Sequence, residues 1–256
     1  MIYLISDDCP KGQYKELKKH GVMAEVSAAA SFRAGALNIN TWILFIQYAC
    51  CFGVELTMNN AAALYFRDQF DQSTESAAAI ASIFGWMNLF ARGTGGFISD
   101  KMNAKCGMRG RIWAQTIFLL GEGAMVLVFA NTGSMGLAIF IMVIFSLFVQ
   151  AAEGSSYGIV PYVDPPATGS ISGNTGAVCF GLGFRQLEYR AAFMIMGFSI
   201  LGSALLSAVL VIKGHAGIFF GKDEAPPAKT ETLSVPTPDA EKAEEVNETP
   251  AAPSDS

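Results

Sequence analysis

Long apolar segments dominate this sequence and restrict the folds that are open to it. Six mostly apolar stretches follow one another after residue 38, each close to the roughly 20 residues that a helix needs to cross a bilayer. They cover residues 41–64, 77–98, 112–130, 135–152, 169–187 and 191–212. Only 15% of all residues are charged, against about a quarter in an ordinary soluble domain. We therefore predict an all-α polytopic membrane protein with six transmembrane helices.

The two flanks of this predicted transmembrane domain (39–213) have a different composition. Residues 1–38 are polar and rich in lysine, which favours a cytosolic segment. Residues 214–256 are rich in proline, alanine and acidic side chains, cannot bury a core, and are predicted to be a disordered tail. The tail holds much of the acid behind the formal net charge of −5, so the rest of the chain is near neutral. Nothing in this charge pattern indicates nucleic-acid binding. The tail could be a regulatory segment or a plain solvated linker.

The basic residues of the connectors predict the orientation. The connector after the second apolar stretch carries Lys101, Lys105, Arg109 and Arg111, whereas the connector after the first carries more acidic than basic residues. Lys and Arg concentrate in cytoplasmic loops of membrane proteins. With six helices, both termini are then expected in the cytoplasm.

Arg92 lies inside an otherwise lipid-soluble stretch. A mid-membrane arginine costs about 2.5–3.5 kcal/mol on insertion scales, so it is kept where it faces protein or water. Asn88 lies one helical turn earlier on the same face. The alternative, an arginine that reaches the headgroups, is less favoured because Arg92 precedes Asp100, the expected end of the helix, by about two turns. We predict that Arg92 contacts an anion.

Four residues of the first apolar stretch share one helix face by their spacing: Tyr48, Phe52, Glu55 and Asn59. This face is either a packing surface with polar residues near its end or part of a binding site. Glu55 is the only acid of its stretch, and a buried carboxyl there could exchange protons, which makes it a candidate for proton coupling. For Glu122, in the third stretch, a structural hydrogen bond is the favoured role.

Glycines follow Arg92 closely. Gly93, Gly95 and Gly96, followed by Asp100, form a glycine-rich helix end that indicates either close helix packing or a gate. The five cysteines show no metal-binding spacing, and no catalytic motif is present. We therefore expect no metal, no cofactor and no enzymatic activity.

Four segments resemble a known transporter family. They are FGVELTMNN (52–60), FGWMNLFARGTGGFISDKMN (84–103), GRIWAQT (110–116) and AAEGSSYGIVPYV (151–163). They are similar to the nitrate/nitrite porters of the major facilitator superfamily, and most of all to eukaryotic high-affinity nitrate transporters of algae and diatoms. The resemblance covers residues 1–213 and matches the C-terminal half of the twelve-helix family fold, preceded by its central loop.

This resemblance implies specific roles. Arg92 matches the substrate arginine of the C-terminal half, and Tyr48 and Phe52 match the aromatic residues beside the anion. Asn174 and Gly176, with Thr175 and Ala177 around them, match the end of the second nitrate signature. The family implies nitrate or nitrite transport by alternating access, with proton symport, at the plasma membrane, in nitrate assimilation. A flat oxyanion suits the forked donors of a guanidinium.

The chain departs from the family in two ways. The first six helices and their arginine are absent from it, and the glycine run that usually precedes Asn174 is shortened. We expect a single-arginine half site to bind anions poorly, so the chain alone should not transport. Its expected partners are the anion, the bilayer, and a missing N-terminal half or an accessory single-span membrane protein. The alternative function is a non-transporting half that associates with another transporter and regulates it.

Overall fold

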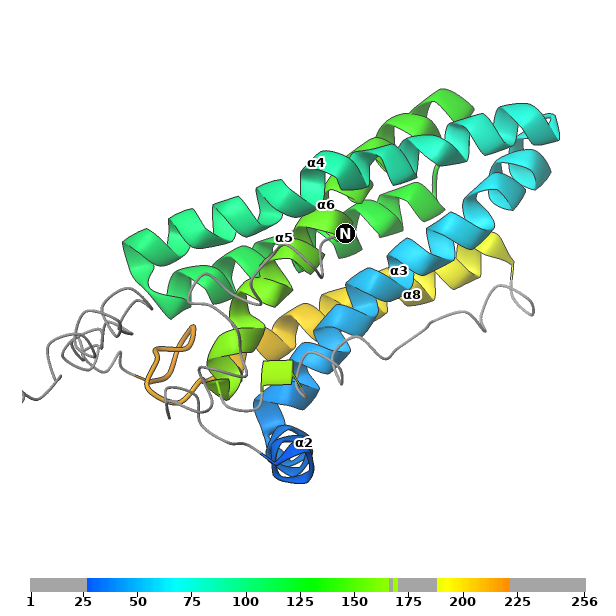
Figure 1. The fold of residues 1–256 in the computed structure, drawn as a ribbon. Helices are drawn as coiled ribbons and strands as arrows, with labels where there is room; N and C mark the ends of the chain where they lie inside the picture. The colour runs from blue at the N-terminus through cyan, green and yellow to red at the C-terminus, as the bar shows by residue number, and fades with distance from the viewer. Residues whose placement is uncertain (1–26, 166–167, 170–187, 222–256) are drawn as a thin grey trace, which may run out of the picture. The chain divides into compact units, whose positions relative to one another are not determined.

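The computed structural model describes residues 27–165, 168–169 and 188–221, all within one compact unit, Val26–Glu224. Over these ranges the chain is helical and contains no strand (Figure 1). The α-helices are α2 (Ala28–Leu37), α3 (Ile39–Phe70), α4 (Thr74–Cys106), α5 (Met108–Ala130), α6 (Met135–Val163) and α8 (Tyr189–Leu205). A short 3₁₀ turn, Leu206–Ala208, continues α8.

Four of the described helices are long and apolar enough to cross a membrane: α3, α5, α6, and α8 with its 3₁₀ turn. This confirms a helical membrane protein, but not six spans. The predicted second span lies in α4, which has 33 residues but carries Arg92 near its middle and Asp100, Lys101 and Lys105 towards its end. The predicted fifth span, 169–187, lies almost entirely outside the described residues.

Several predicted boundaries were wrong. The first stretch was expected to end at residue 64 and the second at residue 98, but α3 runs to Phe70 and α4 to Cys106. The fourth apolar stretch was expected to end before Glu153, but α6 continues to Val163. Small and apolar residues follow Glu153, so the acid does not end the helix; Pro161 lies within its last turn. The sixth stretch was expected to reach residue 212, but helical structure stops at Ala208. Residues 209–221 form a looped segment in which Gly214 and Gly221 adopt positive φ angles of 80° and 87°.

The long helices are joined by very short connections. Gly107 alone separates α4 from α5, with a φ of 64° that favours glycine. Ser73 caps the start of α4, where its side chain accepts a hydrogen bond from the Ser76 backbone. Because these turns are so short, α3, α4, α5 and α6 run alternately up and down beside one another (Figure 1).

Helix α4 packs along α6, while α5 packs against both α6 and α8, and α3 contacts α4, α6 and α8 (Figure 1). The core on one side is aromatic and centres on Phe129, which is fully buried. Its ring partners are Tyr65, Phe66, Phe145 and Phe193. Polar side chains bridge helices elsewhere: Gln115 of α5 donates to Ser156 of α6 at 2.7 Å. Such pairs satisfy groups that lipid cannot hydrate.

Candidate functional site

Arg92 lies near the middle of α4, far from both ends of the helix. The helix continues to Cys106, fourteen residues beyond Arg92, which is about 21 Å at 1.5 Å per residue. A helix of 33 residues is about 50 Å long, against a hydrocarbon core of about 30 Å, so a residue this close to its midpoint lies within the core when the helix spans the bilayer. The structure therefore favours a guanidinium that is held within the helix bundle.

Two carboxylates, from two different helices, contact this one guanidinium. Arg92 Nη2 donates to Glu55 Oε2 of α3 at 2.7 Å and also forms an ion pair with Glu153 Oε2 of α6. Asn88, one turn before Arg92, donates from Nδ2 to Glu55 Oε1 at 2.8 Å. We call these four residues the Arg92 cluster. It joins α3, α4 and α6 at one level of the bundle.

The members of the Arg92 cluster differ sharply in exposure. The side chain of Glu153 is 0% exposed and that of Glu55 is 8% exposed, while that of Arg92 is 41% exposed. The carboxylates thus hold the guanidinium from the protein side, and its other side is left uncovered by the described residues. Lipid tails cannot hydrate a guanidinium, so this uncovered side has to border water, protein or an anion.

Several buried polar atoms around the Arg92 cluster have no hydrogen-bond partner within the described part of the chain. They are Glu153 Oε1, Arg92 Nε, both oxygens of Glu122 and both amide atoms of Gln150. Gln150 precedes Glu153 by one turn of α6, and Glu122 of α5 interacts electrostatically with Glu153. Glu122 therefore lacks, among these residues, the hydrogen bond that its predicted structural role implied. Unsatisfied groups of this kind gather at functional sites.

Close contact between the backbones of α4 and α6 places Glu153 beside Arg92. A Cβ at Gly95 would overlap the Ala151 backbone, whose carbonyl carbon it would approach to 2.7 Å. A Cβ at Gly154 would overlap the Arg92 carbonyl oxygen in the same way. Each helix thus presents a glycine where the other helix passes, as at close crossings of membrane helices.

The predicted aromatic residues lie together next to this region. Tyr48 stacks on Phe52 with ring centroids 5.3 Å apart, and it meets Tyr157 of α6 edge-on at 5.2 Å. Tyr48 is buried and interacts electrostatically with Glu153. The structure therefore brings Tyr48 and Phe52 into the neighbourhood of the Arg92 cluster.

The predicted residues of the fifth stretch are not described, and the three predicted glycines differ in how closely they are packed. Asn174 and Gly176, with Thr175 and Ala177, lie outside the described residues. Added Cβ atoms at Gly93 and Gly96 would meet little: nothing within 4 Å at Gly93, and at Gly96 only the Gly154 carbonyl oxygen, 3.9 Å away. Of the three glycines, only Gly95 is required by helix packing.

Asp100 lies inside α4 rather than in a loop, and it accepts from Arg111 Nη2 at 2.7 Å. Arg111 is buried, and its guanidinium also lies over the Tyr162 ring, 5.4 Å from the centroid. This pair ties the end of α4 to the start of α5 and the end of α6. It is separate from the Arg92 cluster.

Sequence reasoning missed Glu153 and Tyr157 as members of this region. Both lie beyond the point where α6 was expected to end. The sequence signal that the helix continues is the apolar run that follows them, which includes Ile159 and Val160; both are fully buried in the structure. An acid with apolar residues on both sides is an intramembrane acid, not a helix end.

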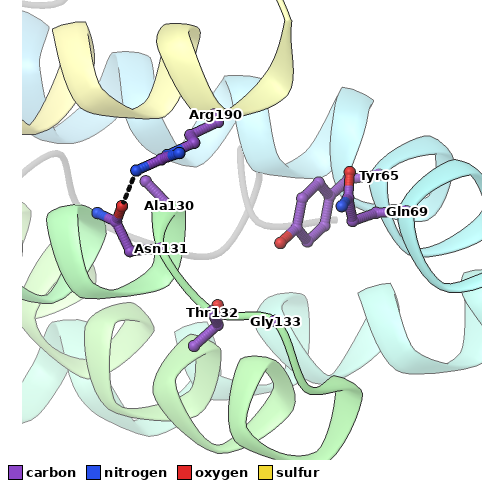
Figure 2. A pocket seen from close by; sticks show the side chains of 7 residues that line it. All are labelled: Tyr65, Gln69, Ala130, Asn131, Thr132, Gly133 and Arg190. Carbon is purple, nitrogen blue, oxygen red and sulfur yellow. Dashed lines mark hydrogen bonds between the residues drawn. The ribbon is translucent and has the colours of Figure 1, made fainter.

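Two hollows are lined by residues outside the Arg92 cluster. One, of about 230 Å³, lies where α3 and α5 end and α8 begins, and Figure 2 shows Arg190 donating to Asn131 Oδ1 there at 2.8 Å. The other, of about 300 Å³, lies between α3 and α4 and is lined by Asn59, Gly85 and small side chains. Asn59 is one turn past Glu55, and Gly85 is one turn before Asn88, so this second hollow adjoins the Arg92 cluster.

The chemistry that this arrangement offers is charge-assisted recognition of a small anion. The described residues contain no group of His, Cys, Asp and Glu side chains that could hold a metal ion. Arg92 instead offers donors on its uncovered side, with aromatic walls and an amide nearby. These are the parts that a flat oxyanion uses.

Known transporters resemble this chain over much of its length. It is 39% identical over 176 residues to "High affinity nitrate transporter 2.5" of Arabidopsis thaliana, which covers 69% of this chain and 35% of that protein. It is 42% identical over 177 residues to "Nitrate transporter 2.1" of Chlamydomonas reinhardtii, which covers 68% and 32%. It is 38% identical over 138 residues to "Nitrate/nitrite transporter NrtP" of Picosynechococcus sp., which covers 53% and 25%.

The alignments thus span about a third of the length of the plant and algal relatives. No family model matches the chain, and no solved structure matches it significantly. All three relatives are named as transporters and none as an enzyme. The part of this chain that aligns with them belongs to the nitrate and nitrite porter family.

Proposed function

We propose that this chain forms the Arg92 half of a membrane transport site for nitrate or nitrite that works by alternating access. The observation that carries the proposal is a guanidinium in the middle of α4, held by carboxylates on one side and uncovered on the other. The relatives named as nitrate transporters support the choice of anion. Because the alignments span about a third of those proteins, the activity of the whole transporter is part of the proposal.

The geometry suits a flat, singly charged oxyanion. Arg92 Nη2 is engaged by both carboxylates, whereas Nη1 makes no hydrogen bond to a described residue. That free end can donate to one or two oxygens of nitrate or nitrite in the plane of the guanidinium. Tyr48 and Phe52 serve as walls, and Asn88 orients Glu55 at the edge of the site. The hollow beside Asn59 offers a route to it.

The remaining features of the proposal follow from the residues and the family. We propose that both termini lie in the cytoplasm, because the Lys/Arg-rich end of α4 and start of α5 favour the inside. The plasma membrane is proposed from the family resemblance alone. Asn174 and Gly176, which lie outside the described residues, are proposed as anion contacts on the family resemblance alone. Transport is coupled to protons, and Glu55, in direct contact with Arg92, is one of the two carboxylates that could take part.

A second function fits one observation. Helix α4 has 33 residues, of which the described structure buries only five, and the Arg92 side chain is 41% exposed. Another protein could cover this face, so a half that pairs with another transporter, or with an accessory single-span membrane protein, and modulates it is the alternative. Co-purification with a separately expressed N-terminal half, without any nitrate uptake, would favour it.

A chimera tests the main proposal. The aligned segment of the Chlamydomonas reinhardtii relative is replaced by this chain, and nitrate uptake is measured in a host without nitrate transporters. We expect uptake, a loss of at least about tenfold in Arg92→Ala, since a charged hydrogen bond contributes about 1.5–3 kcal/mol, and an intermediate value in Arg92→Lys. Arg190→Ala is the matched control because Arg190 bonds only to Asn131 among the described residues.

Surface expression is measured for each variant so that uptake is compared per molecule in the membrane. Uptake by Arg92→Ala at the level of Arg190→Ala would refute a role of Arg92 in anion recognition. Uptake by Arg92→Lys equal to that of the unaltered chimera would show that the forked geometry is not needed.

A further inference from the structure

We propose that Glu153 occupies the anion's place on Arg92 and that a proton taken up by Glu153 frees the guanidinium for nitrate. This inference rests on the proposed function and names the coupling residue of the same site. Glu153 was not among the residues that the sequence indicated, and its role follows from three features of the Arg92 cluster.

The first feature is charge. Two carboxylates and one guanidinium leave the Arg92 cluster with one net negative charge when Glu55 and Glu153 are both ionised. A bound nitrate would bring this to two negative charges in a low-dielectric region, which is unfavourable. One proton from solvent water, bound at the same time as nitrate, leaves the net charge at minus one. The same proton returns to solution when the anion leaves.

The second feature is competition for one donor. Nη2 of Arg92 is shared by Glu55 and Glu153, and a carboxylate is the same kind of ligand for a guanidinium as nitrate: a planar oxyanion. The Glu55 carboxyl also lies within hydrogen-bond reach of Glu153. Protonated Glu153 could donate to Glu55 and release its hold on Arg92, so the guanidinium could turn towards the uncovered side.

The third feature decides between the two carboxylates. Both oxygens of Glu55 accept a hydrogen bond, one from Asn88 and one from Arg92. Glu153 is fully buried, and its Oε1 has no partner among the described residues. A buried, unpaired carboxylate oxygen is unfavourable, and a proton on it removes the charge. The proton therefore belongs on Glu153.

The surroundings of Glu153 contain few other groups that could take the proton. From α3 it is faced by Glu55, Tyr48 and Cys51, from α4 by Arg92, and from α5 by Glu122. Tyr157 lies one turn further on α6 itself. Of these, Glu55 and Glu122 are the other buried carboxyls. Neither oxygen of Glu122 bonds to Arg92 or to any other described residue, which makes Glu122→Gln the matched control.

The test measures nitrate binding by the full 256-residue chain in lipid nanodiscs. A single-arginine site implies weak affinity, so nitrate is titrated around about 1 mM by equilibrium dialysis at several pH values. Proton uptake on nitrate addition is followed with an indicator dye in weak buffer. We expect about one proton per bound nitrate, and an apparent Kd that rises about tenfold per pH unit at alkaline pH.

Glu153→Gln should bind nitrate without proton uptake, with a Kd that no longer changes with pH and is lower than that of the unaltered chain at alkaline pH. Glu122→Gln should keep both the proton uptake and the pH dependence. A purely structural role of Glu153 would weaken binding but leave the number of protons per bound nitrate unchanged.

Three results would overturn the proposal: nitrate binding by the unaltered chain without proton uptake, an unchanged pH dependence in Glu153→Gln, or no nitrate binding at any pH. The first of these needs no variant, so the test stands even if Glu153→Gln fails to fold. Nitrate uptake by the chimera is measured separately. Uptake lost in Arg92→Ala, together with any of these three results, would remove the role of Glu153 and leave the proposed function intact.

Discussion

Gly95→Ala is expected to force α4 and α6 apart at the level of the Arg92 cluster. The added Cβ would overlap the Ala151 backbone, and neither backbone can move aside without shifting a whole helix. Overpacking of this kind costs about 1–3 kcal/mol. Alanine also favours helix over glycine by up to about 1 kcal/mol, which partly offsets the loss.

Gly93→Ala, two residues away in the same helix, isolates the packing effect. An added Cβ at Gly93 has nothing within 4 Å, so this variant gains the helix preference without the overlap. Both variants gain the helix preference of alanine over glycine, so this contribution cancels when their free energies of unfolding are compared. Their difference in free energy of unfolding should then equal the overpacking alone, about 1–3 kcal/mol, or about 5- to 150-fold in the unfolding equilibrium.

Denaturant unfolding of the chain in mixed micelles, followed by circular dichroism, measures this difference. Gly95→Ala should unfold at lower denaturant than the unaltered chain, and Gly93→Ala at the same or a higher concentration. Equal midpoints for the two variants would refute the direct contact of α4 and α6, and with it the placement of Glu153 against Arg92.

Two further predictions test the core and the completeness of the site. Phe129→Ala empties the centre of the aromatic cluster and should lower the free energy of unfolding by about 3–5 kcal/mol in the same assay, whereas a loss below about 1 kcal/mol would contradict the packing around Phe129. The 256-residue chain expressed alone in a host without nitrate transporters should not restore nitrate uptake, because Arg92 is the one guanidinium that the described residues bring to the site; restored uptake would contradict the half-site interpretation.

Helix positions could be predicted from apolarity, but some helix ends could not. The starts of α3 and α6 and the end of α5 fall within two residues of the apolar stretches, whereas α3 ends six residues later and α5 begins four residues earlier than predicted. The end of α6 was misplaced because Glu153 was taken as a helix end. Charge ends a span only when it reaches water, and here a guanidinium from α4 meets the carboxylate inside the bundle. That partner comes from another helix, so local composition could not reveal it.

In the candidate site too, residues that share a face of one helix could be predicted, but contacts between helices could not. Arg92 and Asn88 share a face by their spacing, and so do Tyr48, Phe52 and Glu55, which the structure reproduces as contacts within and between α3 and α4. Which residue of α6 meets them depends on where two glycines let the helices touch. A single sequence shows the glycines but not which of them face each other: Gly95 lies at the crossing, and Gly93 does not.

The ion pair of the Arg92 cluster lies where α4 and α6 cross closely, so it can affect how these two helices pack. Gly154 passes the Arg92 carbonyl, and Glu153, its neighbour, holds the Arg92 side chain, so backbone contact and ion pair lie at the same point of the two helices. Small residues let the two backbones approach closely, and the ion pair adds a polar contact between the helices at the same level. Loss of the Glu153 charge would therefore loosen α4 from α6 and free Arg92 at the same time. A proton at this point would change anion affinity and helix packing together, which is the link that alternating access requires between the bound ligand and the movement of helices.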